Sequence, residues 1–171
     1  LFTFRDKVQI ALNQRVSKEH WVKGDVIPEY TKNALIAIED KRYYKHGAID
    51  VLGIIRALYT NTIAGETLEG GSTITQQLVK NLFLSSKRIM SRKEEILTMY
   101  LNTVYYGHNY YGIYEAAHGY FGTSPSRLTL GQSAMLAALP NAPSYLDPYT
   151  NYEGAKARQK LVLEQMVDQG M

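Results

Sequence analysis

Cysteine is absent from the 171 residues of the chain, so it contains no disulfide and no thiolate metal site. It has no apolar run near the roughly 18 residues needed to cross a bilayer and no secretory signal, so we expect any membrane anchor to lie outside it. The formal net charge of +3 is too small to indicate a nucleic-acid-binding protein. Of all residues, 45% are hydrophobic and 20% are charged, and the sequence has no internal repeats. This composition is typical of one globular domain with a hydrophobic core.

The apolar residues recur at intervals of three and four, which predicts an all-α fold without a convincing strand. Pro28 marks the start of a helix whose last turn contains Glu39. Its inner face is expected to carry Tyr30, Ala34, Leu35 and Ile38.

Other helix starts are marked by capping boxes, in which a Ser or Thr and a Glu or Gln three residues later bind each other's backbone amides. The pairs are Thr73 with Gln76, Ser91 with Glu94, and Thr129 with Gln132. Asp50 is expected to cap a further helix. We expect Pro140 to stop the helix that begins at Thr129, and a last helix to run from about Glu153 to Asp168.

The acid pair Glu39–Asp40 lies behind the apolar run "ALIAI". A carboxylate at a helix C-terminus faces the negative end of the helix dipole, and partial desolvation adds to this, so both effects raise its pKa. A raised pKa suits a general base near neutral pH. An ion pair with Lys41, Arg42 or His46 at a solvated helix end explains the same residues equally well.

A second polar group follows two glycines. Thr73, Gln76, Gln77 and Lys80 fall at i, i+3, i+4 and i+7, so they form one helix face. Such a face suits a sugar hydroxyl or a phosphate near a helix N-terminus. Ordinary amphipathic packing accounts for the spacing as well.

Five stretches resemble, in order, the motifs of one enzyme family. "AIEDKRYYKHGAID" is similar to its first motif, and "GGSTITQQLVKN" matches its second without a mismatch. "YLNTVYYG", "GIYEAAHGYFG" and "LTLGQSAMLAALPNAPSYLDP" resemble the later ones. Over nearly its whole length the chain thus resembles the glycosyltransferase domain of class A penicillin-binding proteins and monofunctional peptidoglycan glycosyltransferases, glycosyltransferase family fifty-one.

The resemblance implies a lysozyme-like helical domain with a smaller membrane-facing jaw, at the extracytoplasmic face of the bacterial cell membrane. Its implied activity is polymerisation of lipid II into β-1,4-linked glycan, with inversion at the anomeric carbon and release of undecaprenyl pyrophosphate. Glu39 corresponds to the general base, and Lys80 and Arg88 to cations beside the leaving group. The expected substrate-binding residues are Asp40, Ser72, Thr73, Gln76, Gln77, Lys80 and Arg88.

The implied partners are lipid II, the growing lipid-linked chain and the membrane, but no nucleic acid. A C-terminal transpeptidase domain is a further expected partner. No tightly bound cofactor is expected, apart from a divalent cation, Mg or Mn, at the pyrophosphate.

The sequence departs from the family pattern at several positions. Tyr43 stands where Phe is usual and Ala48 where Gly is usual, and neither is expected to touch the chemistry. A second essential Glu and a further helix should follow "SRK", but Ile96 occupies the position expected for that Glu. We therefore expect a segment to be missing from the printed chain between Arg88 and Ile96.

The tyrosines at 100, 105, 106, 110, 111, 114 and 120 favour packing at helix edges over a sugar-stacking platform. His108 and His118 have no carboxylate or histidine at ligand spacing, so a metal site there is disfavoured.

Two other functions compete with the polymerase. A lysozyme-like glycan hydrolase also uses a Glu with a raised pKa in a helical fold. A noncatalytic lipid II-binding domain is favoured if the second carboxylate is truly deleted.

Overall fold

The structure, a computed structural model, describes residues 16–39, 43 and 89–171, and the structural statements below concern these residues. They form five α-helices, labelled α2, α5, α6, α7 and α8, and three short 3-10 turns. The only extended pairing in the described part is an isolated bridge between Tyr105 and Tyr111. The prediction of an all-α fold is confirmed.

Helix α2 runs from Glu29 to Glu39, directly after Pro28, as the sequence predicts. Ala34 and Leu35 are buried on its inner face. The prediction that Tyr30 belongs to the inner face is wrong. Its side chain is 38% exposed, and its hydroxyl donates to the Leu128 carbonyl. A phenol hydroxyl needs a polar partner, and here it finds one at the helix edge.

Helix α5 runs without a break from Ile89 to Thr103, so the predicted start at Ser91 is wrong. Ser91 lies inside the helix, and the Glu94 carboxylate accepts a bond from Lys32 Nζ at 3.2 Å. Lys32 also pairs with Glu29 of its own helix at 2.7 Å. The bond to Glu94 joins α2 to α5. Burial lowers the pKa of Lys32, but the two carboxylates raise it more, and the lysine stays charged.

The C-terminal helices follow their sequence signals closely. α7 spans Leu130–Ala138 and begins with the predicted capping box, in which Thr129 and Gln132 bind each other's amides. It ends just before Pro140, and α8 spans Tyr152–Asp168. The helices predicted at Asp50 and Thr73 lie outside the described residues.

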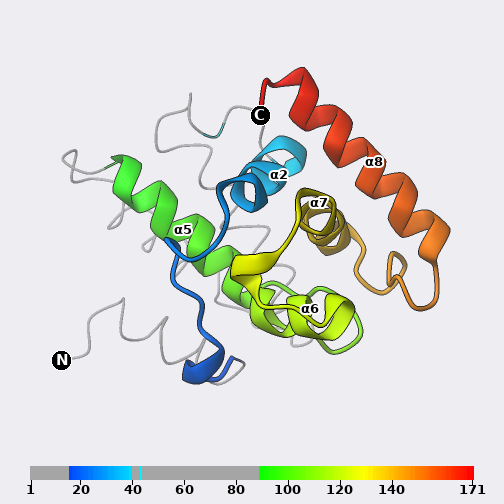
Figure 1. Ribbon diagram of the computed structural model, residues 1–171, viewed down its shortest axis with the longest axis horizontal. Coiled ribbons are helices and arrows are strands. Elements are labelled where there is room, and N and C mark those ends of the chain that lie inside the picture. Colours follow the sequence, from blue (N-terminus) through cyan, green and yellow to red (C-terminus); the bar gives the residue numbers. More distant parts are fainter. Residues whose placement is uncertain (1–15, 40–42, 44–88) are drawn as a thin grey trace, which may run out of the picture.

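Helices α2, α7 and α8 pack on one another through small side chains. Their shared cluster consists of Ala34, Ala37, Ala134, Ala137, Ala138, Val162 and Met166. Short side chains allow helix backbones to approach closely, which gives this group a rigid, closely packed interior. Figure 1 shows α2 and α7 beside α8 at one edge of the described part.

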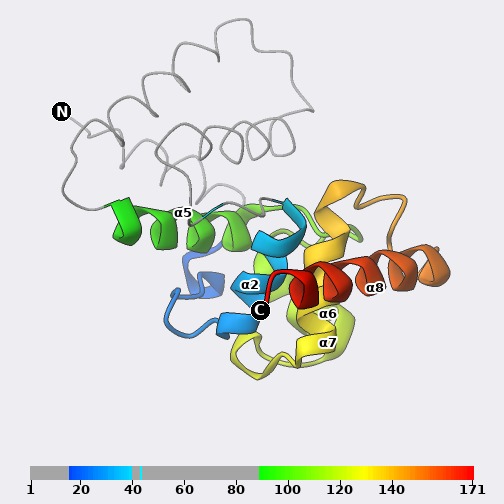
Figure 2. The same ribbon diagram turned by 90° about the horizontal axis from the view of Figure 1, so that it is seen from above.

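Helix α6, Gly112–Phe121, packs against α5 through a larger core of aliphatic and tyrosine side chains. Gly112 has a φ of +81°, and an added Cβ would lie 2.2 Å from the Asn102 carbonyl oxygen, so only glycine fits at this close approach. Both views place α2 between α5 and α8 (Figure 1, Figure 2).

Candidate active site

Glu39 is the last residue of α2, so its carboxylate lies at the negative end of the helix dipole. The residues before it, including Ala37, are buried, while the Glu39 side chain reaches the surface. Desolvation by the surrounding protein raises the pKa of Glu39, and the Arg158 guanidinium opposes that rise. The helix-end position and the raised pKa both agree with the sequence prediction.

Groups from two other helices interact electrostatically with this carboxylate. Arg158 comes from α8 and Tyr100 from α5. Burial raises the pKa of the Tyr100 hydroxyl, and the negative charge of Glu39 raises it further. Tyr100 therefore stays neutral, and the Glu39 carboxylate interacts electrostatically with a cation from one helix and a buried phenol from another.

Three buried polar atoms at the C-terminal end of the described chain have no hydrogen-bond partner, which is uncommon in folded proteins. They are Arg158 Nε and Gln165 Oε1 of α8, and Gln169 Oε1 of the residue that follows the helix. Gln169 Nε2 donates to the Ala37 carbonyl at 3.0 Å, so the residue after α8 contacts the last turn of α2.

Tyr43, four residues after Glu39, is fixed to α5. Its hydroxyl donates to the Lys93 carbonyl at 2.6 Å, and Lys93 Nζ donates to the Tyr43 carbonyl and lies 5.3 Å from the ring centroid. Both residues are buried. A Phe at position 43 could not donate to the Lys93 carbonyl, so the Tyr that replaces the usual Phe adds a hydrogen bond to α5.

The other predicted site residues lie outside the described part of the chain, and their roles stay predictions. They are Asp40, Ser72, Thr73, Gln76, Gln77, Lys80 and Arg88. Ile96, where the second Glu was expected, is buried in α5 with 7% of its surface exposed. Glu94 and Glu95 precede it in the same helix.

Comparison with known proteins identifies the family. A family model described as Transglycosylase matches residues 6–94 and 89–167. The chain belongs to the transglycosylase family. Membership places it among the peptidoglycan glycosyltransferases, enzymes of cell-wall synthesis, and gives its helices the lysozyme-like fold expected from the sequence. The smaller membrane-facing jaw stays a prediction.

Similar proteins are considerably longer than this chain. Penicillin-binding protein 1A of Neisseria flavescens is 42% identical over 170 residues, which cover 90% of this chain and 21% of the relative. The protein of the same name from Aquifex aeolicus is 40% identical over 91% of this chain and 24% of the relative. A crystal structure of penicillin-binding protein 1A from Haemophilus influenzae matches with a TM-score of 0.56 and 27% identity, over 88% of this chain and 15% of that one. The chain spans about a fifth of the length of its curated relatives.

The two stretches matched by the transglycosylase model overlap at residues 89–94. Residues 89–94 include Lys93 and Glu94, where the sequence predicts a missing segment. The missing segment itself stays a prediction.

Sequence reasoning missed two groups. Arg158 gave no local signal, because its relation to Glu39 depends on how α8 packs on α2. His108 has a carboxylate partner after all, since its Nδ1 lies 3.3 Å from Asp147 Oδ2, 39 residues away in sequence. No group of three or more His, Asp or Glu able to hold a metal occurs among the described residues. Nor is any described helix long and apolar enough to cross a membrane.

Proposed function

We propose that this domain polymerises lipid II into β-1,4-linked glycan, with Glu39 as the general base. The observation that carries the proposal is the position of Glu39 at the C-terminal end of α2, where desolvation raises its pKa. A base is most effective when its pKa lies near the working pH, and an unperturbed Glu lies well below it.

In the proposed reaction, Glu39 takes the proton from the 4-hydroxyl of the acceptor sugar as that oxygen attacks the anomeric carbon of the lipid-linked growing chain. A new C–O bond forms on one face, and the bond to the pyrophosphate breaks on the other. The configuration at the anomeric carbon is therefore inverted, and undecaprenyl pyrophosphate leaves with the electron pair. Lys80 and Arg88 would offset the developing negative charge on that group.

Arg158 has a defined part in this proposal. Desolvation alone would favour the protonated carboxyl, which cannot accept a proton. The positive charge of Arg158 opposes that effect and favours the ionised form, which can accept a proton. The net rise in pKa makes Glu39 a stronger base than an ordinary Glu.

A divalent cation at the pyrophosphate stays a prediction. The described residues do not fit a protein-held metal, because they bring no three His, Asp or Glu side chains together. The steps above accordingly use only groups of the chain and its substrates.

The deciding experiment offers the protein labelled lipid II in one sample and finished glycan strands in another. A polymerase consumes lipid II and forms long strands. A hydrolase, which also needs one Glu with a raised pKa, shortens finished glycan and leaves lipid II intact. Binding of lipid II without turnover would favour the noncatalytic domain, for which the buried Ile96 in place of an acid is the supporting observation.

The location of the enzyme at the membrane and the presence of a second domain are also proposals. We infer that it works at the extracytoplasmic face of the bacterial membrane, because both proposed substrates carry a lipid tail. The relatives extend far beyond the matched region, which supports a transpeptidase domain elsewhere in the full protein. Sedimentation with lipid vesicles tests the membrane association, and labelling with a fluorescent penicillin tests the second domain.

A further inference from the structure

Two contacts hold the chain on either side of Glu39. Before it, the Ala37 carbonyl accepts a hydrogen bond from Gln169 Nε2 at 3.0 Å. After it, the Tyr43 carbonyl accepts a hydrogen bond from Lys93 Nζ of α5. Ala37 and Tyr43 are buried, whereas Glu39 itself is exposed. The chain is thus fixed two residues before the proposed base and four residues after it.

The contact between Tyr43 and Lys93 is reciprocal. Lys93 Nζ donates to the Tyr43 carbonyl and lies 5.3 Å from the centroid of the Tyr43 ring, and the Tyr43 hydroxyl donates to the Lys93 carbonyl at 2.6 Å. Lys93 is 1% exposed, and burial of an ammonium group is costly unless polar partners surround it. The lysine keeps these contacts only while Tyr43 stays against α5. The pair is called the Tyr43–Lys93 clamp below.

The clamp belongs to the hydrophobic core that joins α2 to α5. Tyr43 lies in the same buried cluster as Leu35 of α2 and Leu97 of α5. The connection from Tyr43 back to Glu39 is four residues long, so it spans at most about 14 Å even when fully extended. Because this connection is short, a movement of Tyr43 away from α5 would change the position of Glu39.

We propose that the Tyr43–Lys93 clamp positions Glu39 for proton transfer. Tyr43 and Lys93 are buried, so they act through Glu39 and not on the substrate, as positioning residues. The inference rests on the proposed function, in which Glu39 is the general base. Such a base must come within about 2.6–3.2 Å of the atom whose proton it takes, and a misplacement of about 1 Å can cost about 10²-fold in rate. An exposed carboxylate at a helix end meets this requirement only if the chain around it is held in place.

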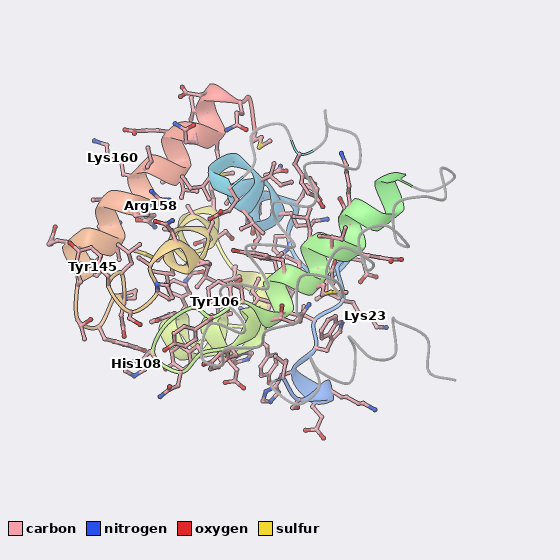
Figure 3. The ribbon with its side chains drawn as sticks, turned by 180° about the vertical axis from the view of Figure 1, so that it is seen from behind. Lys23, Tyr106, His108, Tyr145, Arg158 and Lys160 are labelled. Carbon is pink, nitrogen blue, oxygen red and sulfur yellow. The ribbon has the colours of Figure 1, made fainter. Side chains whose placement is uncertain are left out.

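The clamp also affects the surroundings of the Glu39 carboxylate. Among the described residues, Arg158 of α8 and Tyr100 of α5 act on its charge, and Figure 3 shows Arg158 on the opposite side of α2 from α5. Desolvation raises the pKa of Glu39, so release of the clamp should admit water and lower this pKa. Loss of the Lys93 ammonium through its charge alone would raise the pKa instead. The direction of the change therefore separates positioning from a simple charge effect.

The test measures lipid II turnover by the full-length protein and by two variants of the clamp. Tyr43→Phe keeps the ring and loses only the hydroxyl bond, so kcat should fall by about two- to tenfold. Lys93→Met loses the bond from Nζ, and kcat should fall by about ten- to hundredfold. In both variants KM should stay within about twofold, and the acidic limb of the kcat/KM profile should move to lower pH.

Lys32→Met is the matched control. Lys32 is also a buried lysine that joins α2 to α5, through its bond to Glu94 at 3.2 Å, but it lies seven residues, or roughly 10 Å, before Glu39. This substitution should lower the free energy of unfolding and leave kcat and the acidic limb unchanged. Hydrogen exchange followed by mass spectrometry gives a readout without substrate. The peptide that contains Glu39 should exchange faster in both clamp variants than in Lys32→Met.

The inference is overturned if neither clamp variant changes kcat, if the acidic limb stays in place or moves to higher pH, or if Lys32→Met has the same effects as Lys93→Met. Should Lys93→Met fail to fold, Tyr43→Phe decides alone, because Phe is the usual residue at this position in the family.

Failure of the proposed function gives a different result. A wild-type protein that does not consume lipid II refutes that function, and faster exchange at Glu39 in the clamp variants than in Lys32→Met would still support the clamp. Turnover by the wild type, with unaltered kcat and exchange in the clamp variants, would refute the clamp alone.

Discussion

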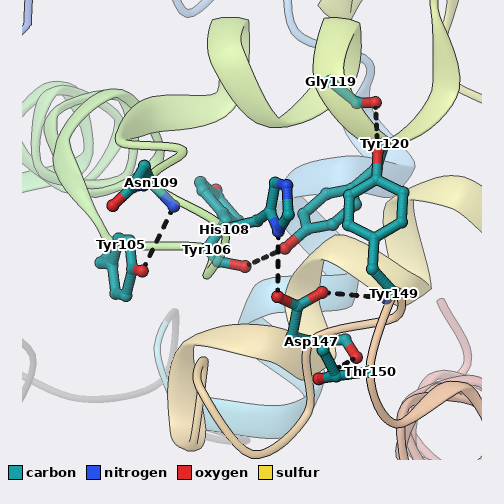
Figure 4. Close-up of polar contacts among 9 residues, drawn as sticks. All are labelled: Tyr105, Tyr106, His108, Asn109, Gly119, Tyr120, Asp147, Tyr149 and Thr150. Atoms are coloured by element: carbon teal, nitrogen blue, oxygen red, sulfur yellow. Dashed lines mark hydrogen bonds and ion pairs between the residues drawn. The ribbon is translucent and has the colours of Figure 1, made fainter.

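Helix α8 with the residue after it, and the two loops at residues 107–111 and 142–151, satisfy their polar groups in opposite ways. In and just after α8, Arg158 Nε, Gln165 Oε1 and Gln169 Oε1 are buried and, among the residues described, have no hydrogen-bond partner. Between the two loops, the Tyr149 hydroxyl and both oxygens of the Asp147 carboxylate have partners (Figure 4).

A buried polar atom without a partner costs about 1–3 kcal/mol, so this part of the molecule is not arranged for greatest stability. The two loops instead gain rigidity from satisfied polar groups. Changes at Glu39, whose pKa is raised, should therefore alter turnover, and changes in the loops should alter the free energy of unfolding.

The largest expected effect comes from Glu39→Gln. Loss of a general base should lower lipid II turnover by about 10²–10⁴-fold, measured as strand formation from labelled lipid II. Because the pKa of Glu39 is raised in the folded state, its stabilising contribution exists below the unfolded pKa and is lost as pH rises through the folded pKa. The substitution should therefore not lower the melting temperature at neutral pH. Polymerisation at the wild-type rate would contradict the assignment.

Asp147→Ala should have the largest effect on stability. It leaves the Tyr149 amide without an acceptor and removes the contact with His108, so the free energy of unfolding should fall by about 2 kcal/mol. Urea denaturation measures this change. Asp25→Ala is the control, because Asp25 is exposed and should change stability by less than about 0.5 kcal/mol. Equal effects of the two substitutions would show that Asp147 does not hold the loops together.

A smaller change is expected at the left-handed loop position 109. Asn109→Ala should destabilise the fold by about 1 kcal/mol, because alanine tolerates a φ of +62° less well than asparagine. Asn109→Gly should be close to neutral, since glycine adopts this conformation freely. The order of the two melting temperatures is the measurement, and a more stable alanine variant would argue against strain at this position.

The smallest expected effect is a shift of the pH profile of kcat/KM on replacement of Arg158. Arg158 lowers the pKa of Glu39, so Arg158→Gln should raise it, and the acidic limb of the kcat/KM profile should move to higher pH. Lys160→Gln is the matched control on the same helix, since its ammonium is exposed and pairs with Glu164 at 3.9 Å. A limb that moves equally in both variants would mean that Arg158 has no specific relation to Glu39.

Local patterns predicted much of the described fold. Pro28 placed the start of α2, Thr129 with Gln132 placed the start of α7, and Glu39 was expected at a helix end with a raised pKa. The errors came where tertiary contacts override local signals. Ser91 with Glu94 has the form of a capping box, but Glu94 pairs with Lys32 of α2 and α5 begins earlier.

The expectation that the tyrosines pack at helix edges holds for most of the residues that it named. Tyr100 and Tyr106 are buried, and Tyr110, Tyr114 and Tyr120 pack against the same core. Tyr111 is an exception, since 37% of its surface is exposed. The most exposed tyrosines are Tyr145, Tyr149 and Tyr152, for which the sequence raised no expectation.

The sequence by itself determined the all-α class, the family and the place of Glu39, because helix periodicity, caps and ordered motifs are encoded within a few neighbouring residues. Only the tertiary structure decided which distant groups meet. Arg158 is brought toward Glu39 by the packing of α8 on α2, and Asp147 reaches His108 across 39 residues. No local pattern records such pairs, because burial and electrostatic reach depend on how whole helices pack.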